Sequence, residues 1–379
     1  MNNHLLFEIK DRYVNVTLAS LTNKWNILYS KKFVFKRNQK NEQSSFDASW
    51  IPHMKQQVSQ IIEFDLIDDI SLILNSRQVI LGSKIFKTPI IEFDIKKGKK
   101  EFIDQLRSDN KNMYVLGVSK AVMAQQGVYA NMKFVYELFP EKQLQTIISS
   151  FQYEGIKIKR VQSGFKAIKK ATQPYMQLSK SVVNIDFDSY FTTITHTLDG
   201  VVQNVSKKNI GIESIYMAVA QQLEVDISSA VKLVKAFGNI PPENIVDNRI
   251  ISSRFNKETG LYKDFDKKQL SSVITQVVNS IYEHIYEDVN ISKESNPLFL
   301  FSGQLSGLKG FVEYSKTTLD INNVKTYKSN IVGINDYDAF VTSGALAKTR
   351  KVSTEDAKQQ PKAQIISLFN RVKRLYNYI

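Results

Sequence analysis

Short apolar segments separated by polar turns open the chain. Four of them are rich in β-branched and aromatic residues, which favour strands: 5–9, 13–18, 25–29 and 33–35. Helical periodicity follows at 49–63, and the continuous apolar run at 70–74 is typical of a buried parallel strand. A meander of strands followed by a helix and a buried strand predicts an α/β lobe.

The segment 85–160 has a pattern of its own. An apolar stretch begins after Pro89, and the basic run at 96–100 predicts a loop. A helix is expected at 144–150 and a strand at 156–161. We therefore expect a small α+β insertion within the first lobe.

The α/β pattern returns after this insertion. A helix is expected at 165–171, and the hairpin signal Asp199-Gly200 joins two of the strand-like segments that follow. Those segments are 181–187, 191–198 and 201–205. From Gly211 onward the periodicity is mainly helical, over 212–223, 227–237 and 268–286. A buried strand at 298–302 and a small-residue helix within 333–348 end the folded body.

Two lobes that each begin with a three-strand meander followed by helices describe the actin-like ATPase architecture. The predicted fold class is α/β, with duplicated ribonuclease-H-like lobes, a small α+β insertion domain and a C-terminal amphipathic helix. In this architecture two hairpins face a nucleotide held between the lobes. The expected boundaries are a first lobe at 1–84, 161–181 and 341–348, the insertion at 85–160, a second lobe at 182–206 and 297–340, a helical subdomain at 207–296, a linker at 349–361 and an amphipathic helix at 362–379.

The end of the chain is strongly amphipathic. At about 100° per residue, its apolar side chains fall on one arc of roughly 120°. They are Ile365, Leu368, Phe369, Val372, Leu375, Tyr376 and Ile379, and the cations on the flanks and opposite face are Lys362, Arg371, Lys373 and Arg374. A basic amphipathic helix on a polar tether predicts reversible attachment to an anionic membrane surface. The alternative is a terminal helix that packs on the protein's own core.

The net charge of +14 is spread through the body, apart from a tail with eight Lys or Arg against two acids. No compact basic stripe is interleaved with aromatic residues, so no nucleic-acid partner is expected. The absence of cysteine and the four scattered histidines favour no metal site. No apolar run could span a bilayer, and the N-terminus lacks the features of a signal peptide. We therefore expect a cytoplasmic protein, peripheral on the inner face of the cell membrane.

Several segments follow, in order, the pattern of the bacterial cell-division protein FtsA, the membrane-anchored actin homologue that tethers FtsZ filaments. The segment 182–194, with Asp186, resembles the second phosphate hairpin of that family. A glycine precedes the helix after it, and Phe237-Gly238 ends another helix. The segment 298–308 resembles the adenosine turn. With the linker and the amphipathic end, the chain resembles a divergent member of the FtsA family over nearly its whole length.

The resemblance implies a site for ATP with Mg²⁺, and it maps that site to Glu8, Asp186, Gly211, Gly303 and Gly307. Phosphate loops need glycine because backbone N–H groups must approach the oxygens closely. The first hairpin has no glycine, and the second has Asp188, Ser189 and Tyr190 where the family has glycines. A carboxylate beside a triphosphate is repulsive unless Mg²⁺ lies between them. We therefore expect a degenerate nucleotide site, a weak or lost ATPase activity and no catalytic residue.

Asp186 is the acid most suited to a role with Mg²⁺, and the alternative is an acid that faces solvent at a strand end. The resemblance implies an adaptor that attaches FtsZ filaments to the membrane at the division site, with self-association presenting many helices at once. The C-terminal peptide of FtsZ would dock on the helical subdomain, whose lysines suit an acidic peptide or form a solvated face. These lysines are Lys232, Lys235, Lys257, Lys263, Lys267 and Lys268.

Two alternatives share the fold. A scaffold of the pilus-assembly type would bind a short peptide of a membrane partner and would need no lipid helix. An enzyme of the sugar-kinase branch of the actin-like superfamily would need intact phosphate glycines, which this chain lacks.

Overall fold

The computed structural model describes residues 2–35, 46–89, 95–126, 129–256, 261–293, 296–329, 331–333, 335 and 339–347. The predicted linker and amphipathic helix lie outside these ranges, as does Lys257. The chain divides into two units, Met1–Ala345 and Leu346–Ile379, and the lobes described below belong to the first unit.

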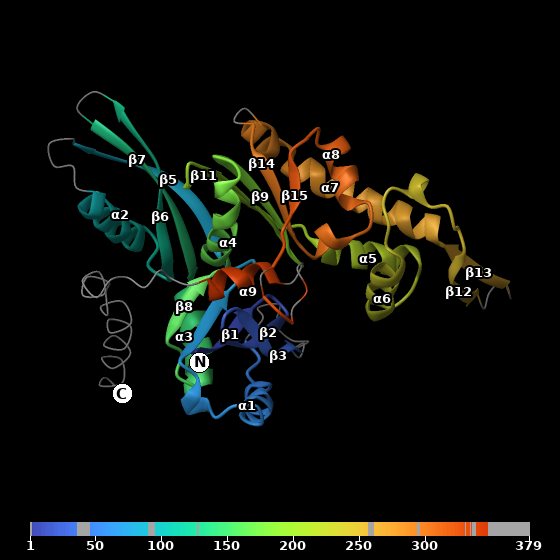
Figure 1. The fold of residues 1–379 in the computed structure, drawn as a ribbon, viewed down its shortest axis with the longest axis horizontal. Helices are drawn as coiled ribbons and strands as arrows, with labels where there is room; N and C mark the ends of the chain where they lie inside the picture. Colours follow the sequence, from blue (N-terminus) through green and yellow to red (C-terminus); the bar gives the residue numbers. More distant parts are fainter. Residues whose placement is uncertain are drawn as a thin grey trace. The chain divides into compact units, whose positions relative to one another are not determined.

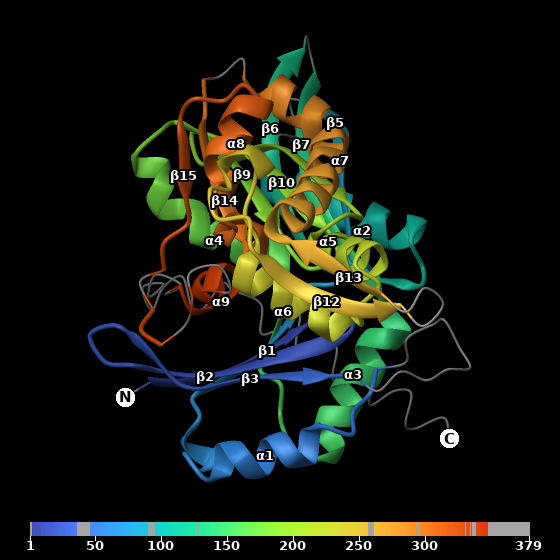
Figure 2. The ribbon, with the colours of Figure 1, turned by 90° about the vertical axis from the view of Figure 1, so that its right-hand side faces the viewer.

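The first lobe is a five-stranded sheet with the strand order β3-β2-β1-β4-β8. Its strands are β1 (Asn2–Ile9), β2 (Tyr13–Leu21), β3 (Trp25–Val34), β4 (Asp69–Leu74) and β8 (Arg160–Ser163). The first three form an antiparallel meander, whereas β4 and β8 run parallel to β1. Two helices, α1 (Ile51–Ser59) and α3 (Glu141–Tyr153), lie on the same side of this sheet (Figure 2). Their buried faces share one apolar core with β1, β2 and β4 because every second strand residue points to that side.

The second lobe repeats the same topology with the strand order β11-β10-β9-β14-β15. Its strands are β9 (Ser181–Phe187), β10 (Thr192–Leu198), β11 (Val201–Lys208), β14 (Leu298–Gly303) and β15 (Val324–Thr326). Its helices are α5 (Ile212–Gln222), α6 (Ile227–Phe237), α7 (Lys267–Lys293) and α8 (Phe311–Thr318). A hairpin of β12 (Ile250–Asn256) and β13 (Leu261–Asp266) projects beyond the start of α7 (Figure 1). An antiparallel hairpin leading into parallel strands in both lobes confirms the predicted actin-like fold.

The insertion is a three-stranded sheet with the order β5-β7-β6, packed on one helix. Its elements are β5 (Ile80–Pro89), α2 (Ile95–Asp109), β6 (Met113–Gln126) and β7 (Tyr129–Pro140). The rings of Phe102 and Phe134 stack in its core with their centroids 4.7 Å apart. The insertion also contacts the second lobe, because Lys133 Nζ donates to the carbonyl oxygen of Gln203 on β11 at 2.9 Å.

Three local predictions were wrong. The basic run at 96–100 belongs to α2 rather than to a loop, because Phe102 and Leu106 bury one face of this helix while Lys99 and Lys100 stay exposed. The segments 25–29 and 33–35 form the single strand β3, since an edge strand tolerates exposed lysines between apolar residues. The strand expected at 156–161 begins only at β8, and the hairpin of β12 and β13 was not predicted.

The remaining elements are short. Single-turn 3₁₀ helices span Phe64–Leu66, Gln173–Gln177, Pro242–Asn244 and Gln304–Gly307, and α4 (Gly164–Thr172) and α9 (Ala339–Leu346) complete the described helices. Among the described residues, no helix combines the length and the apolar character needed to cross a bilayer.

The last described helix, α9, packs closely on α4. A Cβ atom added to Gly344 would lie 1.7 Å from the carbonyl oxygen of Ala167, which is far inside van der Waals contact. Glycine is therefore required at this crossing, although alanine is intrinsically better in a helix by about 1 kcal/mol.

We predict that Gly344→Ala lowers the free energy of unfolding by about 3 kcal/mol, because the steric clash outweighs the gain in helix propensity. The matched control is Ser343→Ala in the same helix, which removes a hydrogen bond of 3.2 Å to Ser329 and no packing contact of this kind. Chemical denaturation of both variants measures the difference. A Gly344→Ala variant as stable as the control would contradict the close packing of the two helices.

Candidate functional site

Two turns face each other where the lobes meet. The first turn, residues 10–12, joins β1 to β2, and the second turn, residues 188–191, joins β9 to β10. Each turn is closed by a backbone hydrogen bond, from Lys10 N to Tyr13 O at 2.9 Å and from Asp188 N to Phe191 O at 3.0 Å. Because the two lobes have the same topology, the turns occupy equivalent places in the two sheets.

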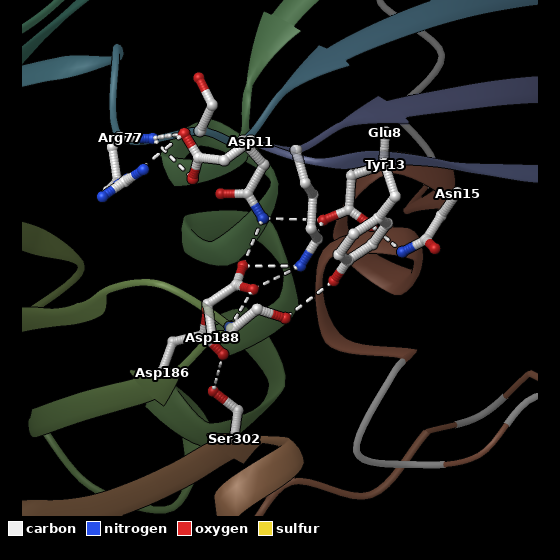
Figure 3. Close-up of polar contacts among 12 residues, drawn as sticks. Glu8, Asp11, Tyr13, Asn15, Arg77, Asp186, Asp188 and Ser302 are labelled. Atoms are coloured by element: carbon white, nitrogen blue, oxygen red, sulfur yellow. Dashed lines mark hydrogen bonds and ion pairs between the residues drawn. The ribbon is translucent and has the colours of Figure 1, made fainter. Parts of the chain in front are cut away.

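The ammonium group of Lys10 in the first turn binds Asp188 of the opposite lobe. Figure 3 shows Asp188 across from Glu8 and Tyr13 of the first lobe. Lys10 Nζ donates to both carboxylate oxygens of Asp188, at 2.7 and 2.6 Å, and lies 3.2 Å from Glu8 Oε1. The side-chain amide of Asn75 donates to Glu8 Oε1 at 2.7 Å and to Asp188 Oδ2 at 2.9 Å. We call Glu8, Lys10, Asn75 and Asp188 the clamp.

The clamp is nearly closed to solvent. The side chain of Lys10 is 12% exposed, and the side chain of Asp188 is 4% exposed. Burial disfavours the ammonium ion, but the charges of Asp188 and Glu8 outweigh burial and hold the pKa of Lys10 well above its usual range. The lysine therefore stays charged, as a buried ion pair requires.

Asp186 lies on β9 beside the clamp, and Ser302 on β14 donates a hydrogen bond of 2.8 Å to its carboxylate. Burial, with a smaller effect from the charge of Asp188, raises the pKa of Asp186 to about 7. The side chain is buried rather than facing solvent. Within the described part of the chain, no group of three or more acidic, histidine or cysteine side chains is arranged to hold a metal ion.

Aromatic residues add to the contact between the turns. The hydroxyl groups of Tyr13 and Ser189 lie 2.8 Å apart in a buried hydrogen bond. The ring of Tyr190, in the second turn, lies near two guanidinium groups of the first lobe, those of Arg12 and Arg77, each 5.4 Å from its centroid. Cation–π contacts of this kind are attractive, with about 0.5–2 kcal/mol for each.

A second buried lysine links the lobes next to the turns. Lys207 on β11 donates to the carbonyl oxygens of Ser76 at 2.6 Å and Val79 at 3.0 Å, in the loop after β4. Burial lowers the pKa of Lys207 to about 8. Lys207 is therefore a further contact between the two lobes.

The start of α5 is occupied by the second turn. A helix N-terminus attracts anions because its first N–H groups have no partner in the helix. Here Ile212 N donates to Asp188 O at 3.2 Å, and Glu213 N donates to Ser189 O at 2.9 Å. A Cβ atom on Gly211 would lie 2.4 Å from Asp188 O. This glycine is thus needed for the contact between the turn and the helix.

Of the other two predicted glycines, Gly303 has a structural role and Gly307 lies outside the cavity beside the clamp. Gly303 has a φ of +83°, and a Cβ atom there would lie 2.2 Å from Phe187 O, so it allows the end of β14 to approach β9. Gly307 ends a 3₁₀ helix and is exposed. Glu8, Asp186, Gly211 and Gly303 therefore meet near the clamp, whereas Gly307 does not line the cavity beside it.

A cavity of about 360 Å³ lies beside the clamp. Its walls include the clamp residues Glu8, Lys10 and Asp188, the end of β14 at Gly303, Lys235 of α6 and the start of α9. This volume falls in the range of small-molecule sites. The residues present do not form the cradle that a triphosphate with Mg²⁺ needs, because Lys10 is paired with Asp188 and neither turn has a glycine.

The lysines predicted for a partner differ in their surroundings. Lys263 is 3.4 Å from Glu224 and Lys267 is 2.8 Å from Asp247, so both are paired within the subdomain. Lys232 and Lys268 are exposed, and Lys235 lines the cavity.

Sequence reasoning missed the clamp lysine and its partner amide. The first hairpin lacks a glycine but has Lys10, and the second has Asp188 where a glycine is usual. Residues of opposite charge that replace glycines in two facing turns are the sequence signal that could have identified the ion pair of Lys10 and Asp188. No sequence signal marks Asn75 or Lys207, which reach the site only through the fold.

The buried Asp186 makes stability depend on pH. Its pKa is raised in the folded state, so folding favours the protonated form, and the stability falls as pH rises from the unfolded pKa near 4 through about 7. Asp188, Lys10, Glu8 and Ser302 surround the group.

We predict that Asp186→Asn is more stable than the wild type above pH 7, by about 1–3 kcal/mol, and that this advantage shrinks steadily as the pH falls toward the unfolded pKa near 4. Thermal unfolding between pH 5 and 8.5 measures the effect, with the exposed Asp65→Asn as the control. A gain that does not change with pH would show that Asp186 is ionised throughout.

No protein-family model matches this sequence, and no curated protein matches it. Solved structures do match. PilM of the PilM-PilN type IV pilus biogenesis complex has a TM-score of 0.65 at 10% identity, over 91% of this chain and 95% of that one. MreB5 of Spiroplasma citri bound to ADP has a TM-score of 0.54 at 8% identity, over 91% and 95% of the two chains.

The MamK double helical filament has a TM-score of 0.50 at 12% identity, over 91% of this chain and 99% of that one. Similarity at these identities concerns the fold alone. The resemblance to FtsA stays a prediction. This protein has the actin-like ATPase fold.

Proposed function

We propose that this protein is a non-catalytic actin-like adaptor that attaches FtsZ filaments to the cytoplasmic membrane. The non-catalytic part of the proposal is carried by one observation, the buried ion pair between Lys10 and Asp188. Phosphoryl transfer depends on a site that positions the phosphates and neutralises their charge. Here the gap between the turns holds a paired lysine and two further carboxylates, Glu8 and Asp186.

The attachment to the membrane rests on the sequence after the described residues. The apolar arc from Ile365 to Ile379 would enter the headgroup boundary, and the cations beside it would meet anionic lipid. A single helix of this length binds weakly, so stable attachment needs several copies. Self-association, of the kind that the MamK filament illustrates for that protein, would present many helices to one surface.

The choice of FtsZ rests on the resemblance to FtsA. Its acidic C-terminal peptide would bind the subdomain of α5, α6 and α7. Two exposed lysines support this, because within the described ranges Lys232 and Lys268 form no ion pair that a peptide would have to break. Lys263 and Lys267 are already paired and would contribute less.

A scaffold of the pilus-assembly type is the second candidate. The observation in its favour is the similarity to PilM, a protein solved in complex with PilN, over most of both chains. Such a scaffold would bind a peptide of a membrane protein. It would not need the amphipathic end for its location.

Flotation with anionic vesicles separates these functions. We predict that the full chain carries FtsZ of the same organism to the top of a gradient with phosphatidylglycerol vesicles, and that a chain ending at Gln360 does not.

A matched pair of substitutions tests the helix itself. Phe369→Asp lies within the apolar arc and should abolish flotation, whereas the adjacent Asn370→Asp adds the same charge on the polar face and should keep most of it.

Two outcomes contradict parts of the proposal. If the full chain floats but leaves FtsZ behind, FtsZ is not the partner, and the pilus-type function becomes the better account. If the full chain and the shortened chain both stay at the bottom, the end of the chain is not a membrane anchor.

A further inference from the structure

We propose that Lys10 takes the place between the two hairpins that the actin-like architecture gives to a nucleotide, so that the two lobes stay together without one. This inference concerns the state of the lobes and does not depend on the partner or on the membrane. It rests on three features of the described residues: the position of Lys10, the balance of charge around it, and the other contacts between the lobes.

The position of Lys10 is the first feature. It belongs to the turn of the first lobe, and its ammonium group binds both oxygens of Asp188 in the turn of the second lobe. The two residues are 178 positions apart in the sequence, so this contact joins the lobes rather than parts of one lobe. Hydrogen bonds between two charged groups are stronger than those between neutral groups.

The balance of charge is the second feature. One ammonium group faces the carboxylates of Glu8 and Asp188, and Asn75 donates to both of them. A phosphate that entered this gap would have to displace Lys10 and lie against those carboxylates. Displacing Lys10 would leave Asp188 buried without its cation, which is strongly unfavourable. The carboxylate oxygens of the clamp therefore already have hydrogen-bond partners in the chain's own side chains. With two carboxylates against one ammonium group, the clamp would repel an added anion.

The remaining contacts between the lobes are the third feature. Tyr13 reaches Ser189, Lys207 reaches the loop after β4, and Tyr190 lies near two arginines of the first lobe. The backbone of β3 also pairs with the segment at Val332, because Ile27 N donates to Val332 O at 3.0 Å and Val332 N donates to Trp25 O at 3.1 Å. All of these contacts join the lobes through the chain's own residues.

The consequence is a protein whose lobes have one arrangement with or without nucleotide. A molecule that enters the cavity beside the clamp would meet Lys235 and the end of β14 but would not be needed to link the turns. A ligand shifts a conformational equilibrium only if it binds the two states differently. With the clamp in place, MgATP has little to add to the closed state.

The absence of cysteine allows a direct distance measurement. Gln60→Cys at the end of α1 and Ala236→Cys on α6 place two exposed labels on opposite lobes. Pulsed electron paramagnetic resonance on the full chain then gives the distribution of distances between the lobes. We predict one narrow distribution that millimolar MgATP does not change. We also predict a broader or longer distribution for Lys10→Met.

Two further variants make the test specific. Lys31→Met removes another lysine that lines the same cavity but does not bind Asp188, and it should keep the narrow distribution. The exchange of charges in Lys10→Asp with Asp188→Lys should restore part of the narrow distribution, because the ion pair is rebuilt in reverse. If Lys10→Met does not fold, Lys10→Gln, which keeps a polar end but no charge, replaces it.

The proposal is overturned by either of two results. One is a wild-type distribution that is broad alone and becomes narrow only with MgATP, which would make the nucleotide the link between the lobes. The other is a folded Lys10 variant with the same distribution as the wild type, which would make the ion pair irrelevant to closure. Neither result bears on whether the chain floats with vesicles or carries FtsZ, so the membrane and FtsZ parts of the proposed function fail separately from this inference. The first result would also remove the support for its non-catalytic part, which rests on the same ion pair.

Discussion

The ion pair between Lys10 and Asp188 constrains everything around it, because two charges taken out of water must be paired and hydrogen-bonded. That requirement explains why Asn75 donates to both carboxylates and why Glu8 lies within reach of the ammonium group. It also explains why the two turns have charged residues instead of glycines. A glycine at either position would allow a phosphate to approach, but it would leave the opposite charge without a partner.

The duplicated topology brings these charges together. Each lobe places a hairpin next to a parallel strand, β1 with β4 and β9 with β14, so the two hairpin turns have equivalent places in their sheets. In this chain the turns meet directly, and α5 supplies its first N–H groups to the second turn. The site is therefore a contact between the two copies of one structural unit. Its ion pair and hydrogen bonds join the two copies to each other.

Much of the fold followed from the sequence, and the clamp did not. The strands β4, β9 and β14 are rich in apolar residues and almost entirely buried, and such segments are the strongest local signal of a central strand. The helix α2 was missed because its lysines suggested a loop, and the hairpin of β12 and β13 because its mostly polar residues lack a clear alternation. The pairing of Lys10 with Asp188 depends on how two distant turns meet, and no local pattern contains that information.

A double-mutant cycle tests the central claim most directly. The free energies of unfolding of the wild type, Lys10→Met, Asp188→Asn and the double variant give the energy of coupling between the two side chains. The account predicts that the two single substitutions are not additive, with a coupling of about 2 kcal/mol or more, because each one leaves a buried charge that the other removes. Additive losses would mean that the two residues act independently, and the ion pair could not then be what holds the lobes together.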